Sequence, residues 1–226
     1  MKKAISGLIF RIIGLIIGIS GITIHLVFHT TPDAAFMGSH VMAYFTIQTN
    51  FFTTFIFLWL LLKTAYVGIK MHKLELVHIF PSFHLACTFF ITITMLGYWL
   101  ILMPMSSLPK NPMLAASNFL LHTFTPLCAI VDCIFFFDHG KLNWKDAFKW
   151  LTYPVLYLIS VIIIAQVSNE PYYTIQGKQL QYPYPFLDPQ FVGVGGMIGC
   201  IIGLAVFFVL FALLYIFVYN QISKSI

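Results

Sequence analysis

The chain has 226 residues, of which 60% are hydrophobic and only 8% are charged, and its formal net charge is +5. A soluble domain carries roughly 25% charged residues, so this composition excludes a water-soluble globular protein and indicates a polytopic membrane protein. The basic residues stand beside the ends of apolar runs rather than in a patch with interleaved aromatics, which argues against a nucleic-acid partner.

Six apolar runs are long enough to be membrane spans, since a spanning helix needs about 20 mostly apolar residues. In chain order, the predicted spans are residues 4–28, 42–67, 76–103, 113–137, 148–167 and 191–219. We therefore expect an all-α fold in which residues 1–226 form a single six-helix transmembrane domain.

Two of the runs are long for one span, and we expect the third or the sixth to tilt or break. Pro81 and Pro126 are expected to kink their helices. The sixth run also carries a glycine series that permits close contact with a neighbouring helix: Gly193, Gly195, Gly196, Gly199 and Gly203.

The basic residues predict the orientation of the spans. With a cytoplasmic N-terminus, only Lys110 and Lys178 fall on the outer side. Ten fall on the cytoplasmic side: Lys2, Lys3, Arg11, Lys63, Lys70, Lys73, Lys141, Lys145, Lys149 and Lys224. The positive-inside rule therefore predicts that both termini are cytoplasmic, in a multi-pass protein of the cell membrane.

Three loops are then extracytoplasmic, at residues 30–41, 104–112 and 168–190. The last contains the string QYPYPFLD at residues 181–188. Aromatic residues and prolines of this kind suit the level of the lipid headgroups. We expect this segment to form a rigid lid.

Polar residues gather at the start of the second span. Thr46, Asn50 and Thr53 share one helix face by their spacing, and Gln48 and Thr49 extend the polar character of this turn. Threonines in membrane helices commonly bond back to their own carbonyls or join neighbouring helices. This much polarity within a turn and a half is more typical of a helix that faces a cavity.

The fourth span carries His122, with Asn118 one turn before it and Thr125 one turn after. A neutral histidine that bonds between helices is the structural interpretation. The functional interpretation is a general base, because an imidazole can take the proton of an attacking hydroxyl. Thr46 and His122 are expected to differ in depth by only about 6 to 9 Å at ~1.5 Å rise per residue, so they can meet in the outer leaflet.

Two further groups of polar residues lie in or beside the spans. Asp132 is the one acid well inside a span, and we expect His84 to pair with it in an architectural role. His25 and His29, one turn apart, and His40 in the following loop allow a metal-dependent enzyme as an alternative, although no third ligand has diagnostic spacing. Our primary interpretation needs neither a metal nor another cofactor.

Several short motifs resemble the androgen-induced-gene and ADTRP family of membrane proteins. They are Phe45-Thr46 at the start of the second span, Asn118 and His122-Thr123 before a proline in the fourth, and the YPFLD string at residues 184–188. The YFTIQTN string at residues 44–50 looks more like the bacterial branch of that family. The resemblance covers the whole six-span layout.

This resemblance implies an intramembrane hydrolase of fatty acid esters of hydroxy fatty acids. Its threonine nucleophile and its histidine would fall on Thr46 and His122. Animal members carry another histidine three residues before the catalytic one, where this chain has Phe119. The resemblance therefore determines the reaction type better than it determines the substrate. Candidates for oxyanion or substrate binding are Gln48, Asn50, Asn118, Tyr184 and Asp188.

The expected substrate is a lipid ester taken from the membrane. The alternative to hydrolysis is a non-enzymatic membrane transporter, or a lipid-binding or scaffold protein. A transporter would often show paired broken helices or an inverted repeat, and neither is evident in the sequence.

Overall fold

The computed structural model describes residues 2–29, 40–78, 80–105, 108–137, 141–168, 172–173 and 179–225. Within these residues, six helices are long and apolar enough to cross a membrane. They span Lys3–Phe28, Phe45–Met71, Pro81–Leu102, Pro112–Phe136, Asp146–Val167 and Pro189–Lys224. These are the six runs predicted from the sequence, with ends that differ by a few residues.

The elements follow one another in a mainly helical order. The α-helices are α1 (Lys2–Phe28), α2 (Phe45–Met71), α3 (Pro81–Gly97), α4 (Pro112–Phe119), α5 (Thr125–Val131), α6 (Asp146–Trp150), α7 (Thr152–Val167) and α8 (Pro189–Ser225). Short 3-10 turns lie at Val41–Ala43, Met103–Met105 and Pro185–Leu187. One departure from an all-α chain is the antiparallel pair of β1 (Tyr172–Tyr173) and β2 (Gln179–Leu180).

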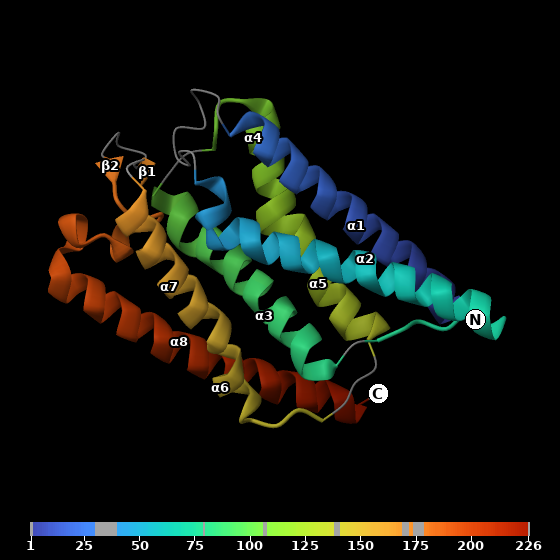
Figure 1. The fold of residues 1–226 in the computed structure, drawn as a ribbon. Helices are drawn as coiled ribbons and strands as arrows, with labels where there is room; N and C mark the ends of the chain where they lie inside the picture. Colours follow the sequence, from blue (N-terminus) through green and yellow to red (C-terminus); the bar gives the residue numbers. More distant parts are fainter. Residues whose placement is uncertain are drawn as a thin grey trace.

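Helices α1, α2, α3 and the α4–α5 span pack on one another as the inner group of the bundle. Helices α6, α7 and α8 lie along the other side of α3 (Figure 1). A cluster of buried side chains joins α3 to this second group, with Phe89 of α3 against Trp150 of α6 and Tyr215 of α8. Helix α3 therefore stands between the two groups.

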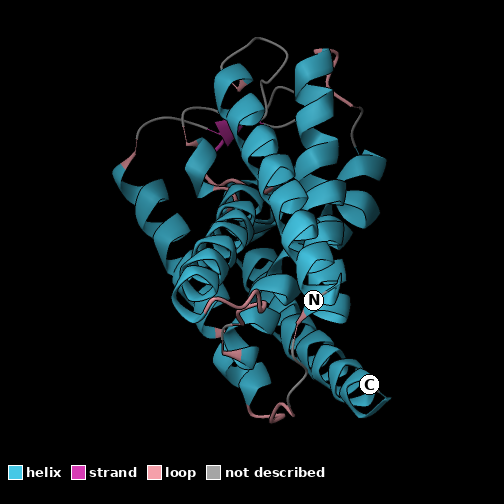
Figure 2. Ribbon diagram, turned by 90° about the vertical axis from the view of Figure 1, so that its right-hand side faces the viewer, coloured by secondary structure: helices cyan, strands magenta, loops and turns pink. Residues whose placement is uncertain are grey.

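Both termini lie toward one end of the bundle, and β1 and β2 lie toward the other (Figures 1 and 2). The end with the strands carries the start of α2 and the end of α7. Much of the predicted outer loops 30–41 and 168–190, and part of 104–112, lies outside the described residues. The side of the membrane that each end faces stays a prediction.

Polar caps and prolines set several helix starts. Asn111 accepts hydrogen bonds from the backbone N–H groups of Met113 and Leu114, at 2.9 and 3.4 Å, and Pro112 takes the first helical position of α4. Pro81 likewise occupies the first turn of α3. The predicted kink at Pro81 was therefore wrong, because a proline at the first position of a helix removes no intrahelical hydrogen bond.

The two long runs are irregular, as expected. The third ends in a π-helical segment, Tyr98–Leu102, that continues α3. The sixth has a non-helical residue at Gly193, with φ 74° and ψ 160°, in the left-handed half of conformational space that glycine tolerates.

The predicted close contact at the glycines of α8 was wrong. A Cβ built at Gly193, Gly195, Gly199 or Gly203 meets nothing within 4 Å among the described residues. Close packing occurs at α1 instead. A Cβ at Gly14 would lie 2.9 Å from the ring of Phe57, and one at Gly21 would lie 2.9 Å from Leu120. The small residues that bring helices together are therefore those of the first span, against α2 and the fourth span.

Candidate functional site

An apolar pocket of about 220 Å³ lies between α3, α7 and α8, with the start of α2 at one side. Ile101, Val155 and Leu204 line it and are themselves exposed. The pocket therefore opens on the apolar flank of the molecule. Its walls can hold a hydrocarbon chain.

A group of hydroxyls stands in the wall of this pocket at the N-terminal end of α2. Thr46, Tyr157 and Tyr184 all line the pocket. The Tyr184 hydroxyl interacts with the side chains of Thr46 and Tyr157 and with the backbone of Phe45 and Thr46. These two backbone groups belong to the first turn of α2, whose N–H groups have no partner within the helix.

The environment keeps Tyr184 protonated. Burial raises the pKa of its phenol to about 12, although the hydrogen bonds around it favour the phenolate. At neutral pH this residue is therefore an O–H donor beside the Thr46 hydroxyl. The predicted nucleophile thus has a phenol and two helix N-terminal N–H groups near it.

Hydrogen bonds tie the Thr46 turn to the neighbouring helices. The Thr46 carbonyl accepts from the Thr49 hydroxyl at 3.1 Å and from the Asn50 amide at 2.9 Å. The Thr49 hydroxyl also meets the Thr94 hydroxyl of α3 at 2.8 Å, and the Asn50 amide donates to the Leu121 carbonyl at 3.1 Å. The start of α2 is therefore held against both α3 and the fourth span.

His122 stands one layer behind the pocket wall. Its ring stacks on Tyr98, which lines the pocket, with centroids 3.8 Å apart and an angle of 13°. Its imidazole also interacts with the backbone of Thr94. Since Thr94 bonds to Thr49, the predicted base and the predicted nucleophile belong to one connected cluster at the same end of the bundle.

The backbone around His122 is irregular for a reason that lies in the sequence. His122 sits in the π-helical segment Leu120–Phe124, four residues before Pro126. Pro126 has no N–H to donate to the His122 carbonyl. That carbonyl accepts from the Trp99 indole instead, at 3.2 Å, and Trp99 also donates to the Thr123 hydroxyl at 3.0 Å. Single-turn π-helical segments of this kind are frequent at functional sites.

Other predicted site residues are engaged elsewhere. Gln48 donates to the Met42 carbonyl at 3.1 Å and accepts from the Tyr153 hydroxyl at 3.1 Å. Both N–H groups of Asn50 are used in the two bonds given above, so in this conformation Asn50 links helices and has no donor left for an oxyanion. Asn118 is half-buried on α4, and Thr125 is fully buried.

Asp188 caps α8. Its carboxylate accepts from the backbone N–H of Gln190 at 2.8 Å and from that of Gln181 at 2.7 Å. The first bond satisfies the start of the helix, and the second fixes the segment that carries Tyr184. Asp188 therefore positions the predicted lid, whose Tyr184, Phe186 and Leu187 line the pocket.

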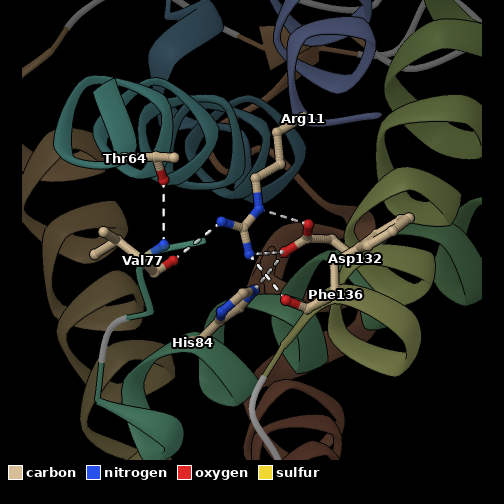
Figure 3. Close-up of polar contacts among 6 residues, drawn as sticks. All are labelled: Arg11, Thr64, Val77, His84, Asp132 and Phe136. Atoms are coloured by element: carbon tan, nitrogen blue, oxygen red, sulfur yellow. Dashed lines mark hydrogen bonds and ion pairs between the residues drawn. The ribbon is translucent and has the colours of Figure 1, made fainter. Parts of the chain in front are cut away.

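A second polar site joins the first half of α1 to the last segment of the fourth span (Figure 3). Arg11 donates to both oxygens of Asp132, at 2.7 and 3.3 Å, and neither side chain is exposed. The guanidinium also donates to the carbonyls of Val77 at 3.0 Å and Phe136 at 3.3 Å. His84 Nε2 lies 3.7 Å from Asp132.

The expected pair of Asp132 and His84 is present at 3.7 Å. Arg11, which the sequence places among the cytoplasmic charges, is a second and closer partner of Asp132, because a buried guanidinium requires a counter-charge. Its signal was present in the sequence, as one arginine and one aspartate inside separate apolar runs. The π-helical segments and the contacts of Tyr98, Trp99 and Tyr157 had no comparable signal.

The histidines of the metal alternative have separate partners. His25 Nδ1 lies 3.2 Å from the Ser117 hydroxyl, His29 Nδ1 lies 2.6 Å from the Leu26 carbonyl, and His40 Nε2 lies 2.6 Å from the Ser168 hydroxyl. Within the described part of the chain, no three His, Cys, Asp or Glu residues form a group that could hold a metal ion.

The fold defines a helical protein with six helices that are long and apolar enough to span a membrane, with an apolar pocket between them. Comparison of the chain with models of protein families, with curated proteins and with solved structures finds no match.

Proposed function

We propose that the protein is an intramembrane hydrolase of lipid esters, with Thr46 as nucleophile and His122 as its base. One observation carries the proposal: the Thr46 hydroxyl lies in the wall of an apolar pocket that opens on the lipid-facing flank. An ester whose acyl chain fills this pocket has its carbonyl near Thr46. The resemblance to the androgen-induced-gene and ADTRP family assigns the same two residues.

The chemistry proceeds through an acyl-enzyme. His122 takes the proton of the Thr46 hydroxyl as its oxygen attacks the ester carbonyl, and the alcohol leaves with that proton. Water then attacks the acyl-threonine while His122 accepts a proton from it, which releases the acid and restores Thr46. This step requires the imidazole and the hydroxyl to come within about 2.6–3.2 Å when substrate is bound. In the structure the imidazole interacts with the Thr94 backbone, and no hydrogen bond joins it to Thr46 among the described residues.

The negative charge on the carbonyl oxygen needs donors. Tyr184 is protonated at neutral pH, and the N–H groups of Phe45 and Thr46 point out of the first turn of α2. We assign Tyr184 as the oxyanion donor in preference to Gln48 or Asn50, and the two N–H groups, which interact with the phenol oxygen, hold it in place. One such donor is worth roughly 10²–10³ in kcat.

The decisive experiment compares purified wild type, Thr46→Ala and His122→Ala on medium-chain and long-chain esters, and labels each with a fluorophosphonate probe. We expect each variant to lose at least about 10³-fold in turnover and Thr46→Ala to lose labelling. Thr92→Ala is the matched control, because its hydroxyl bonds to a carbonyl of its own helix at 2.7 Å. Full activity in folded Thr46→Ala would refute the mechanism. A wild type that binds lipid without hydrolysis would favour the non-enzymatic alternative.

The cytoplasmic location of both termini belongs to the same proposal. It rests on the distribution of basic residues and agrees with the position of both termini toward one end of the bundle (Figure 1).

A further inference from the structure

A row of buried polar atoms runs through the core formed by α2, α3 and the fourth span. Each belongs to a side chain that is at most 8% exposed, and none has a hydrogen-bond partner among the described residues. They are Asn50 Oδ1, Thr53 Oγ1, His84 Nδ1, His122 Nδ1 and Thr125 Oγ1. Thr54 Oγ1, which also lacks a partner, lies against Gly18 of α1 and is outside the row. The catalytic proposal uses only His122 from this set.

The spacing of these residues places most of them along shared helix faces. Asn50 and Thr53 are three residues apart on α2, and His122 and Thr125 are three apart on the fourth span. Helices α2, α3 and α5 pack against one another. His84 stands on α3 toward the Arg11–Asp132 end. The row therefore extends from the second polar site toward the cluster that contains His122.

A small cavity lies in this row. Thr53 of α2 and His84, Cys87 and Thr88 of α3 line it, and it leaves about 10 Å³ for the centre of a water-sized sphere. That is room for about one water molecule. Two of its lining groups, Thr53 Oγ1 and His84 Nδ1, are among the unpartnered atoms, while the other nitrogen of His84 faces Asp132.

Physical chemistry favours water at these positions. A buried donor or acceptor that lacks a partner costs the full desolvation of that atom, and internal waters typically make about three hydrogen bonds to such groups. The proposed hydrolysis also consumes a water molecule. The ester pocket is almost wholly apolar and opens toward lipid, so its mouth is a poor route for water.

We propose that internal waters bind along this row, from the cavity at His84 to His122. We propose further that the row supplies the water that hydrolyses acyl-Thr46, a second step that rests on the proposed function.

Hydration of the row is tested without any activity measurement. Thr53→Val keeps the shape of the side chain and removes its hydroxyl. If Thr53 binds water, this variant should melt about 3 °C or more below wild type. Radiolytic hydroxyl-radical labelling of Cys87, which lines the cavity, should fall severalfold. Thr92→Val is the control and should leave Cys87 labelling unchanged.

The opposite result is equally clear. Removal of a hydroxyl that truly lacks a partner leaves stability unchanged or raises it. A Thr53→Val variant that melts at or above the wild-type temperature overturns the hydration proposal. So does a wild type in which Cys87 takes up no label.

The supply step is tested by rapid quenching with an activated ester. Thr53→Val should form the acyl-enzyme at the wild-type rate and release it about 10-fold more slowly. Equal release rates would overturn the supply step. If wild type forms no acyl-enzyme, the proposed hydrolysis fails, and the labelling and melting results still decide whether the row is hydrated.

Discussion

At the scale of single residues, the environment of Thr46 is what separates it from an ordinary membrane threonine. Thr49, Thr88, Thr92 and Thr94 all bond to carbonyls of their own helices. The Thr46 hydroxyl instead meets the phenol of Tyr184, from a segment far along the chain, at the wall of a pocket. A hydroxyl proposed as a nucleophile needs such surroundings.

Tyr184→Phe tests the oxyanion assignment. Loss of the hydroxyl should lower kcat by about 10²-fold with little change in KM, because the donor acts on charge that develops in the transition state. Since the pKa of the phenol is raised to about 12, the difference between the two proteins should persist from pH 7 to pH 10. Tyr153→Phe is the matched control, because that hydroxyl bonds to Gln48. Equal losses in both variants would argue against a specific role for Tyr184.

Asp132→Asn tests the architectural role of the second polar site. The substitution leaves the guanidinium of Arg11 fully buried without a counter-charge, which should cost about 3–5 kcal/mol in the free energy of unfolding. Melting in detergent measures it. Arg11→Met combined with Asp132→Leu should recover much of the stability. Unchanged melting together with lost turnover in Asp132→Asn would assign Asp132 to the chemistry instead.

At the scale of elements, two of the three π-helical segments in the described part of the chain lie at the proposed site, and the third, Asp132–Phe136, lies at the Arg11–Asp132 pair. Tyr98 and His122, whose rings stack, lie in two different π-helical segments. A π-helical turn adds one residue and rotates the side chains that follow. Pro126 accounts for the segment at His122 because it removes a donor and crowds the preceding turn. Two helices with otherwise regular patterns thus present their aromatic rings to each other.

Gly18→Ala tests the close approach of α1 and α2. The added Cβ would overlap the side chain of Thr54, and relief of this overlap should cost about 1–3 kcal/mol. Gly199→Ala on α8 makes the same chemical change where a Cβ meets nothing within 4 Å among the described residues. We expect a lower melting temperature for the first variant and an unchanged or higher one for the second. Similar melting of both variants would contradict the assignment of α1 as the tightly packed helix.

At the scale of the whole molecule, the two polar regions occupy different ends of the bundle. The start of α2, which carries Thr46, lies toward β1 and β2, and the N-terminal half of α1, which carries Arg11, lies toward the termini (Figure 1). The positive-inside rule places the second end in the cytoplasm. An outward-facing pocket would then receive lipid from the outer leaflet.

A single cysteine in residues 174–178, in a background without the native cysteines, tests this orientation. That segment lies outside the described residues, between β1 and β2 in the chain. A membrane-impermeant maleimide should label it in intact cells, because the loop is predicted to be extracytoplasmic. A second cysteine near Lys141 should label only after lysis. The reverse pattern would invert the topology and place the pocket toward the inner leaflet.

The sequence by itself determined the spans, since a run of about 20 apolar residues has few alternatives to a membrane helix. It also singled out Thr46, His122 and Asp132, because polar groups in hydrocarbon are costly and therefore conspicuous. It misplaced the start of the third span at residue 76, because the loop before Pro81 is as apolar in composition as the helix that follows it.

Tertiary structure alone decided which polar groups meet. Helical spacing gives the face of a side chain and its depth, but the rotation and neighbours of each helix arise from packing across the bundle. For that reason Arg11 proved to be a closer partner of Asp132 than His84. Gly193, Gly195, Gly199 and Gly203 of α8 faced no described neighbour, and Tyr184 reached Thr46 from a loop 138 residues away in the chain. Side-chain contacts between distant segments depend on the fold as a whole, and the local sequence pattern does not predict them.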